Sequence, residues 1–205
     1  MQHVHNQLIK DIITYGKQRL FRRIQKEITK DLTPEFLKTL KTKKGLTQTK
    51  ERDYIAKITE TLHRMNVPFE GAGSQQSKDY RNVNGINLHI EVKKTDSFKI
   101  IFNDTLPTSD IFYIILFTGK EYKTKSDIEP QLVFLNGSTL VEESNDWIQE
   151  YKKEVELLKN KYCRGENKKK LQGCMEVYVR PTYSANIRHL IHPVPCPVPC
   201  PVSSV

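Results

Sequence analysis

Apolar and ionisable residues alternate strictly in the segment 88–93. Three apolar residues recur at every second position: Leu88, Ile90 and Val92. Three ionisable residues lie between them: His89, Glu91 and Lys93. A period of two is typical of a β-strand with one face on a core and one face exposed. The turn sequence Asn84-Gly85 precedes this strand, so we expect segments 75–82 and 86–93 to form an antiparallel hairpin.

Apolar residues at helical spacing predict three helices before this hairpin. The first covers about residues 6–29 and carries several lysines and arginines, which form either a phosphate-contacting face or a solvated one. The second begins at Thr33-Pro34-Glu35, where Thr33 is a suitable N-cap and Pro34 suits the first helical position, and it should end near Gly45. The third covers about residues 50–65.

The second half of the chain predicts two strands, a long helix and a last strand. The continuous apolar run 111–117 indicates a strand covered on both faces, and 131–135 indicates a short one. The stripe in 144–162 predicts a helix with Ser144 as N-cap, and a last strand comes near 175–180. This order favours a mixed α/β fold, with a central mixed β-sheet flanked by helices.

We expect one domain over residues 1–192. Its helical part is 1–66, its sheet core is about 67–140, and its C-terminal helix and strand occupy 144–192. The segment 193–205 repeats Val-Pro-Cys-Pro, and proline lacks the amide hydrogen that helices and central strands need. We therefore expect a flexible, extended tail there.

Composition narrows the possible partners and the compartment. The 205 residues include 33 Lys and Arg against 24 Asp and Glu, a net charge of +9 that attracts polyanions such as nucleic acid. No apolar run approaches the roughly 20 residues of a membrane span, and the first residues lack the features of a secretion signal. We expect a cytoplasmic protein with reduced cysteines. A zinc site from the C-terminal cysteines and histidines is an alternative, although their spacings lack a Cys-x2-Cys knuckle.

The polar face of the 88–93 strand carries candidate chemistry. Asp79 and Glu91 together could ligate Mg²⁺, with Lys93 beside them, as a metal-dependent phosphodiesterase requires. This needs both carboxylates on one face of the hairpin. A two-residue loop at Asn84-Gly85 would separate them, whereas a three-residue loop, a bulge or a longer loop of the same parity would bring them together. The other interpretation is an exposed, ion-paired strand face.

Glu51 lies in the middle of the apolar stripe of the third helix, near its start. A carboxylate there either points into water, helped by the helix dipole, or points into a site beside the sheet. The sequence leaves both alternatives open.

The order of these features resembles the PD-(D/E)XK nuclease superfamily over about residues 50–120. The segments Gly73–Arg81 and Ile90–Thr95 look like type II restriction endonucleases, and Phe102–Pro107 before the apolar strand is similar to the segment after the Glu-x-Lys strand of such enzymes. The resemblance implies a restriction-endonuclease-like core, with Asp79 and Glu91 as Mg²⁺ ligands and Lys93 acting on the attacking water. Glu51 matches an auxiliary helix carboxylate. Lys78 is a departure, because many members have proline there.

The resemblance implies a Mg²⁺-dependent type II restriction endonuclease that cuts double-stranded DNA at a short palindrome, acting as a homodimer. Six polar side chains near the site are candidates for DNA contacts: Gln75, Gln76, Lys94, Thr95, Ser97 and Asn103. Two alternatives remain open. One is a structure-specific repair or junction nuclease with the same metal centre, and the other is a basic DNA-binding domain without catalysis.

Overall fold

The computed structural model describes residues 2–41, 47–71, 78–103, 106–119, 128–141, 145–165, 179 and 182–191. Its helices are α1 (Gln2–Asp31), α2 (Pro34–Thr39), α3 (Thr47–Arg64) and α4 (Asp146–Tyr162), with short 3-10 turns η1 (Gly137–Thr139) and η3 (Arg188–Leu190). Its strands are β1 (Glu70–Gly71), β2 (Tyr80–Val83), β3 (Leu88–Thr95), β4 (Lys99–Asn103), β5 (Ile111–Phe117), β6 (Gln131–Asn136) and β7 (Thr182–Asn186).

Five strands form the central sheet in the order β1-β2-β3-β5-β6. β3 and β5 pair in parallel, from His89 opposite Ile111 to Thr95 opposite Phe117, and the other neighbours are antiparallel. β5 lies inside the sheet and is buried along its whole length, as a continuous apolar run predicts. The expected mixed α/β fold with a mixed sheet is therefore confirmed.

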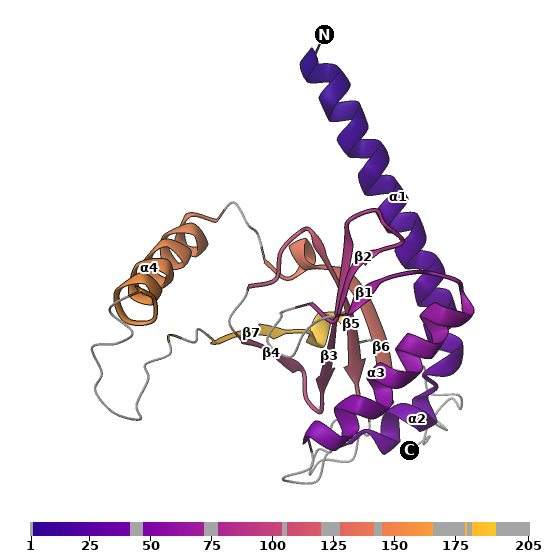
Figure 1. The fold of residues 1–205 in the computed structure, drawn as a ribbon. Helices are drawn as coiled ribbons and strands as arrows, with labels where there is room; N and C mark the ends of the chain where they lie inside the picture. Colours follow the sequence, from indigo (N-terminus) through magenta and orange to yellow (C-terminus); the bar gives the residue numbers. More distant parts are fainter. Residues whose placement is uncertain are drawn as a thin grey trace, which may run out of the picture.

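The N-terminal helices cover one face of this sheet (Figure 1). The ring of Phe21 on α1 lies 4.7 Å from that of Phe112 on β5. The Tyr80 hydroxyl donates to the Ile55 carbonyl of α3 at 3.1 Å. The apolar side of β3 faces these helices, because Leu88, Ile90 and Val92 belong to the same buried cluster. The ionisable side chains of β3 therefore lie on the opposite face of the sheet, away from these helices.

A two-stranded sheet, β4 with β7, covers the opposite face at β5 and β6. The ring of Phe102 on β4 meets that of Tyr113 on β5 edge to face, with 5.6 Å between their centres. Neither strand was expected from the sequence. The expected strand at 175–180 lies outside the described residues except for Val179, and so does the tail 193–205.

Helix α4 stands apart from the central sheet (Figure 1). The sequence predicted an apolar stripe along this helix. Only Val155 of this helix is buried among the described residues, whereas Trp147 is 81% exposed. Tyr151 does reach β7, with its ring 5.5 Å from that of Tyr183. The predicted helix is confirmed, but its N-cap is Asn145, whose side chain accepts from the Trp147 amide, and not Ser144.

The boundaries of the N-terminal helices differ in detail from the expected ones. α1 is longer than 6–29 at both ends, and α3 begins three residues before position 50. Thr33 caps α2 as predicted, because its hydroxyl accepts from the Phe36 amide at 3.3 Å. That helix ends at Thr39, well before Gly45. Within the described residues, no helix is long and apolar enough to cross a membrane.

The β2–β3 hairpin uses neither of the two loops considered from the sequence. Val83 pairs with Leu88, while Tyr80 pairs with Ile90, so the register shifts by one residue within β2. The backbone absorbs this shift at asparagines with positive φ, including Asn82 at 46°, and asparagine tolerates this conformation better than most residues. The longer loop and the irregularity together produce the parity that the nuclease interpretation requires.

Candidate active site

Asp79 and Glu91 face each other across the β2–β3 hairpin. The register of Tyr80 with Ile90, continued by one residue, places Asp79 opposite Glu91. One hydrogen bond holds this arrangement. The Val92 amide donates to Asp79 Oδ2 at 2.7 Å. The two carboxylates are therefore brought to one place by the backbone itself.

Lys93 completes the group from the same face of β3. Its Nζ donates to Glu91 Oε1 at 2.6 Å, and the Glu91 side chain is only 12% exposed. The other oxygen, Glu91 Oε2, is buried and has no hydrogen-bond partner among the described residues. A buried carboxylate oxygen without a donor is unfavourable and is rare in folded proteins. A cation or a hydrogen-bond donor at this oxygen would therefore be stabilising.

The pKa values of both acids reflect this burial. Burial raises the pKa of Glu91 to about 7 against the attraction of Lys93, and the charge of Asp79 raises it further. Burial also raises the pKa of Asp79, although the Val92 amide and Lys93 oppose the shift. One ammonium thus compensates two buried carboxylates incompletely, and an additional positive charge would relieve the imbalance.

Glu51 adds a third acidic group near this pair. It lies in the first turns of α3 and its side chain is exposed, so its position agrees with the alternative in which it points to solvent. Its charge nevertheless raises the pKa of Asp79. The structure thus places Glu51 at the border of the group. Tyr54, one turn further along α3, is buried, and its pKa is raised by burial and by the charges of Glu51 and Asp79.

Asp79 and Glu91 suit Mg²⁺ better than a metal that takes all of its ligands from the protein. The described residues hold no group of three His, Cys, Asp or Glu side chains arranged around one metal position. Mg²⁺ keeps several waters and binds through one or two carboxylates together with substrate phosphates, so two carboxylates suffice. Zinc in a structural site takes four protein ligands. Of the cysteines and histidines considered for zinc, the described residues include only Cys163 and His189.

A second set of charged groups surrounds His89 on the same strand. Burial and the charges of Lys78, Lys17 and Arg81 lower the pKa of His89, while the charge of Asp110 opposes them. Lys78 Nζ lies 3.4 Å from Asp110 Oδ2. Neither Asp110 nor Arg81 was among the site residues expected from the sequence. Asp110 immediately precedes an apolar strand, and only the parallel pairing of β3 with β5 brings it beside His89.

The candidate DNA contacts are placed very differently from one another. Lys94 is 8% exposed at its side chain and ion-paired with Asp96 at 2.8 Å, on the side of β3 away from Lys93. Thr95 is buried, and its hydroxyl bonds to the Lys99 carbonyl at 2.7 Å. We do not retain these two as DNA contacts, because their polar groups are engaged inside the protein.

Ser97 and Asn103 remain accessible in the structure. Ser97 lies at the turn between β3 and β4, and its hydroxyl accepts from the Lys99 amide at 3.2 Å. Asn103 is exposed at the end of β4. Gln75 and Gln76 lie outside the described residues.

The core of the expected site is therefore assembled from Asp79, Glu91 and Lys93, with Glu51 at its border. Comparison with protein-family models, with curated proteins and with solved structures found no match to this chain.

Proposed function

We propose that this protein is a Mg²⁺-dependent nuclease that hydrolyses phosphodiester bonds of double-stranded DNA. The observation that carries the proposal is the convergence of Asp79, Glu91 and Lys93 at one buried position, where one Glu91 oxygen has no partner among the described residues. The net charge of +9 supports a polyanionic substrate.

Asp79 and Glu91 would hold the ion in this proposal. Mg²⁺, when bound, supplies positive charge that polarises the phosphate and lowers the pKa of water. The Val92 amide that donates to Asp79 Oδ2 holds this carboxylate in place and favours its ionised form. Their raised pKa values describe the protein without the ion, and a divalent cation favours the ionised form of both.

Lys93 acts as a positioned ammonium. It is a donor in the structure, because its Nζ bonds to Glu91 Oε1. From there it can stabilise the negative charge that builds up on the phosphate as water attacks. The reaction forms a bond from the water oxygen to phosphorus and breaks the bond to one sugar oxygen, which leaves as a hydroxyl after taking up a proton.

The resemblance to type II restriction endonucleases extends the proposal to a homodimer that cuts at a short palindrome, since two antiparallel strands must be treated alike. It also suggests that the central sheet is a restriction-endonuclease-like core. The parallel pair β3 and β5 with an antiparallel hairpin on one side is compatible with that proposal.

A cleavage assay tests the proposal. Purified protein is incubated with plasmid DNA and Mg²⁺, and the ends of any fragments are sequenced. We expect discrete fragments that disappear with a chelator and with Glu91→Gln. The matched control is Glu60→Gln, an exposed carboxylate on α3, which should cleave like the parent.

The outcomes separate the alternatives. Preferential cutting of branched substrates without a sequence pattern would favour a structure-specific nuclease. If the parent protein binds DNA but does not cleave it with any divalent cation, the nuclease proposal is refuted in favour of a non-catalytic DNA-binding domain.

A further inference from the structure

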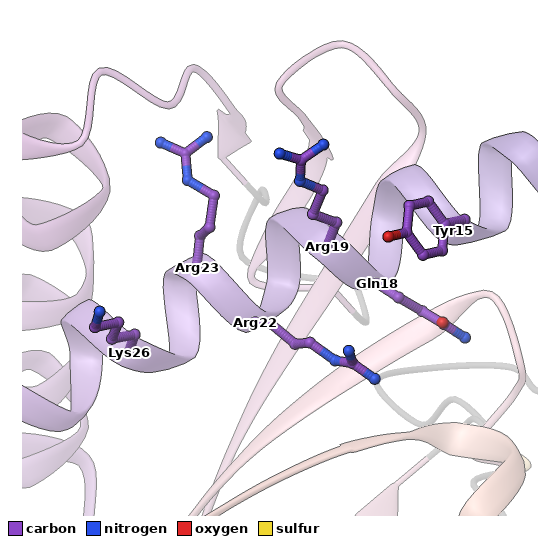
Figure 2. A pocket seen from close by; sticks show the side chains of 6 residues that line it. All are labelled: Tyr15, Gln18, Arg19, Arg22, Arg23 and Lys26. Carbon is purple, nitrogen blue, oxygen red and sulfur yellow. The ribbon is translucent and has the colours of Figure 1, made fainter.

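Four cationic side chains lie together on the outer face of α1, away from the core. They are Arg19, Arg22, Arg23 and Lys26, and all four are exposed. With Tyr15 and Gln18 they line a shallow crevice of about 290 Å³ along the helix. Figure 2 shows Arg19 and Arg23 projecting from one flank of the helix, and Arg22 and Gln18 from another. We call these six residues the α1 basic strip.

The packing of α1 explains why the strip is exposed. Leu20, Phe21, Ile24 and Ile28 are buried against α3 and the sheet. At 100° per residue, the strip is centred on roughly the opposite side of the helix from these four. The tertiary structure therefore holds the basic side chains outward on a helix whose other side is fixed in the core.

Within the described part of the chain, the cationic side chains of the strip lack the ion pairs that several basic side chains elsewhere in the protein form. For example, the Arg64 guanidinium lies 2.5 Å from Asp31 Oδ2, and Lys38 Nζ lies 2.9 Å from Glu129 Oε2. Among the described residues, no carboxylate lies within ion-pair distance of the four cationic groups of the strip. Four neighbouring cations without counter-charges repel one another, so a bound polyanion would be stabilised there.

The spacing of the charges suits a phosphate backbone. Arg19 and Lys26 are seven residues apart, which is about 10 Å along a helix, so the four cations succeed one another at about 3.5 Å on average, in uneven steps. Phosphates of one DNA strand succeed one another at about 3.4 Å along the duplex axis. Three of the four cations are arginines, which can bind phosphate oxygens through two parallel hydrogen bonds.

We propose that the α1 basic strip binds the phosphate backbone of double-stranded DNA, at a place separate from the Asp79–Glu91 centre. The choice of DNA as the polyanion rests on the proposed function. The charge pattern itself is observed independently of that function. The strip lies on the outer side of the helical layer, and Glu91 and Lys93 lie on the strand face turned away from that layer. The strip therefore contributes affinity without touching the reacting phosphate.

The test measures DNA binding by the full-length chain at several salt concentrations. A short fluorescent DNA duplex and a chelator are used, so binding is measured without cleavage. We expect the triple variant Arg19→Gln, Arg22→Gln and Arg23→Gln to lower the slope of log affinity against log salt by about 2.7, which is about 0.9 for each lost phosphate contact. The corresponding triple Arg→Lys variant keeps the charges and should keep the slope.

A matched control removes three positive charges elsewhere. The triple variant Lys152→Gln, Lys153→Gln and Lys161→Gln on α4 has the same net charge. An equal loss of slope in this control would overturn the proposal, because net charge alone would then explain the effect. An unchanged slope in the arginine triple variant would overturn it too, provided that circular dichroism shows the parent's fold.

Two further arms test other anionic partners. Loss of binding to duplex RNA or to anionic lipid vesicles, with DNA binding unchanged, would overturn the proposal. Cleavage by the parent in Mg²⁺ is measured separately. If the arginine variant changes the slope but the parent does not cleave DNA, the strip proposal stands and the nuclease proposal is refuted. If the parent cleaves DNA but the slope is unchanged, the nuclease proposal stands and the strip proposal is refuted.

Discussion

The Val92 amide donates a hydrogen bond to Asp79 Oδ2 at 2.7 Å. This bond joins the residue before β2 to the middle of β3, and it fixes the side of the hairpin on which the Asp79 carboxyl lies. Because Val92 stands between Glu91 and Lys93, the same segment of backbone positions all three charged groups. The juxtaposition of these groups thus depends on the register of the β2–β3 hairpin.

The first prediction concerns the pH dependence of stability without metal. Glu91 has a pKa of about 7 in the folded protein, against an ordinary value of 4.5. Between these values the folded state retains a proton that the unfolded state releases, so stability falls as pH rises through this window. Glu91→Gln removes the effect. We expect this variant to be more stable than the parent at pH 8, by about 3 kcal/mol at most, and the difference to shrink toward pH 4.5.

Urea unfolding with a chelator at pH 8 and pH 5 measures this difference. Glu60→Gln serves as the control and should show no pH-dependent change. A stabilisation by Glu91→Gln of equal size at both pH values would contradict the assigned titration.

The second prediction concerns stabilisation by Mg²⁺. An ion that binds only the folded state raises the free energy of unfolding by about 1.4 kcal/mol at ten times its Kd. For a chain of this size, that corresponds to a rise in Tm of about 3–6 °C. We expect the parent to show this rise in thermal scans, and Asp79→Asn to lose it. Asp53→Asn, an exposed acid on α3, should behave like the parent. A similar rise in both variants would place the ion elsewhere.

The third prediction concerns Lys93 in catalysis. Lys93→Met removes the donor that contacts Glu91 Oε1 and that is proposed to stabilise the phosphate in the transition state. Removing one such donor typically lowers the rate about 100- to 1,000-fold, so we expect cleavage to fall by about that factor while DNA affinity stays near the parent's. Single-turnover cleavage and a binding titration separate the two quantities. Lys99→Met, an exposed lysine on β4, is the control. Equal losses of binding and cleavage in Lys93→Met would refute the assigned role.

The fourth prediction tests how α1 is anchored. Ile24 is 0% exposed against the sheet and α3, whereas Ile12 on the projecting part of the same helix is 62% exposed. Ile24→Ala should lower the free energy of unfolding by about 2–5 kcal/mol, because it leaves a cavity. Ile12→Ala should change it by less than about 0.5 kcal/mol. Chemical denaturation measures both. Similar effects at the two positions would mean that α1 packs differently.

Local pattern was sufficient for several parts of the fold. Residues 111–117 form a buried strand with the expected bounds, since a continuous apolar run stays out of water on both faces. Thr33 caps its helix because the capping interaction lies within four residues. The alternation in 88–93 identified both the core face and the charged face of β3.

Long-range packing decided what the local pattern left open. α4 has an apolar stripe, yet Trp147 remains exposed, because a stripe shows which face is apolar and does not supply the surface that covers it. Lys94 looked available for DNA on the basis of its type. Its side chain is 8% exposed and ion-paired with Asp96, and the sequence pattern could not show this pairing.

The sequence alone determined the residue types of the candidate site and the face of β3 that carries Glu91 and Lys93, because side chains alternate along any strand. It could not determine whether Asp79 joins them. That depended on a one-residue register shift within β2, and such a shift moves a side chain to the other face of a sheet. Only the tertiary structure, through the pairing of Tyr80 with Ile90 and the parallel contact of β3 with β5, selected the register.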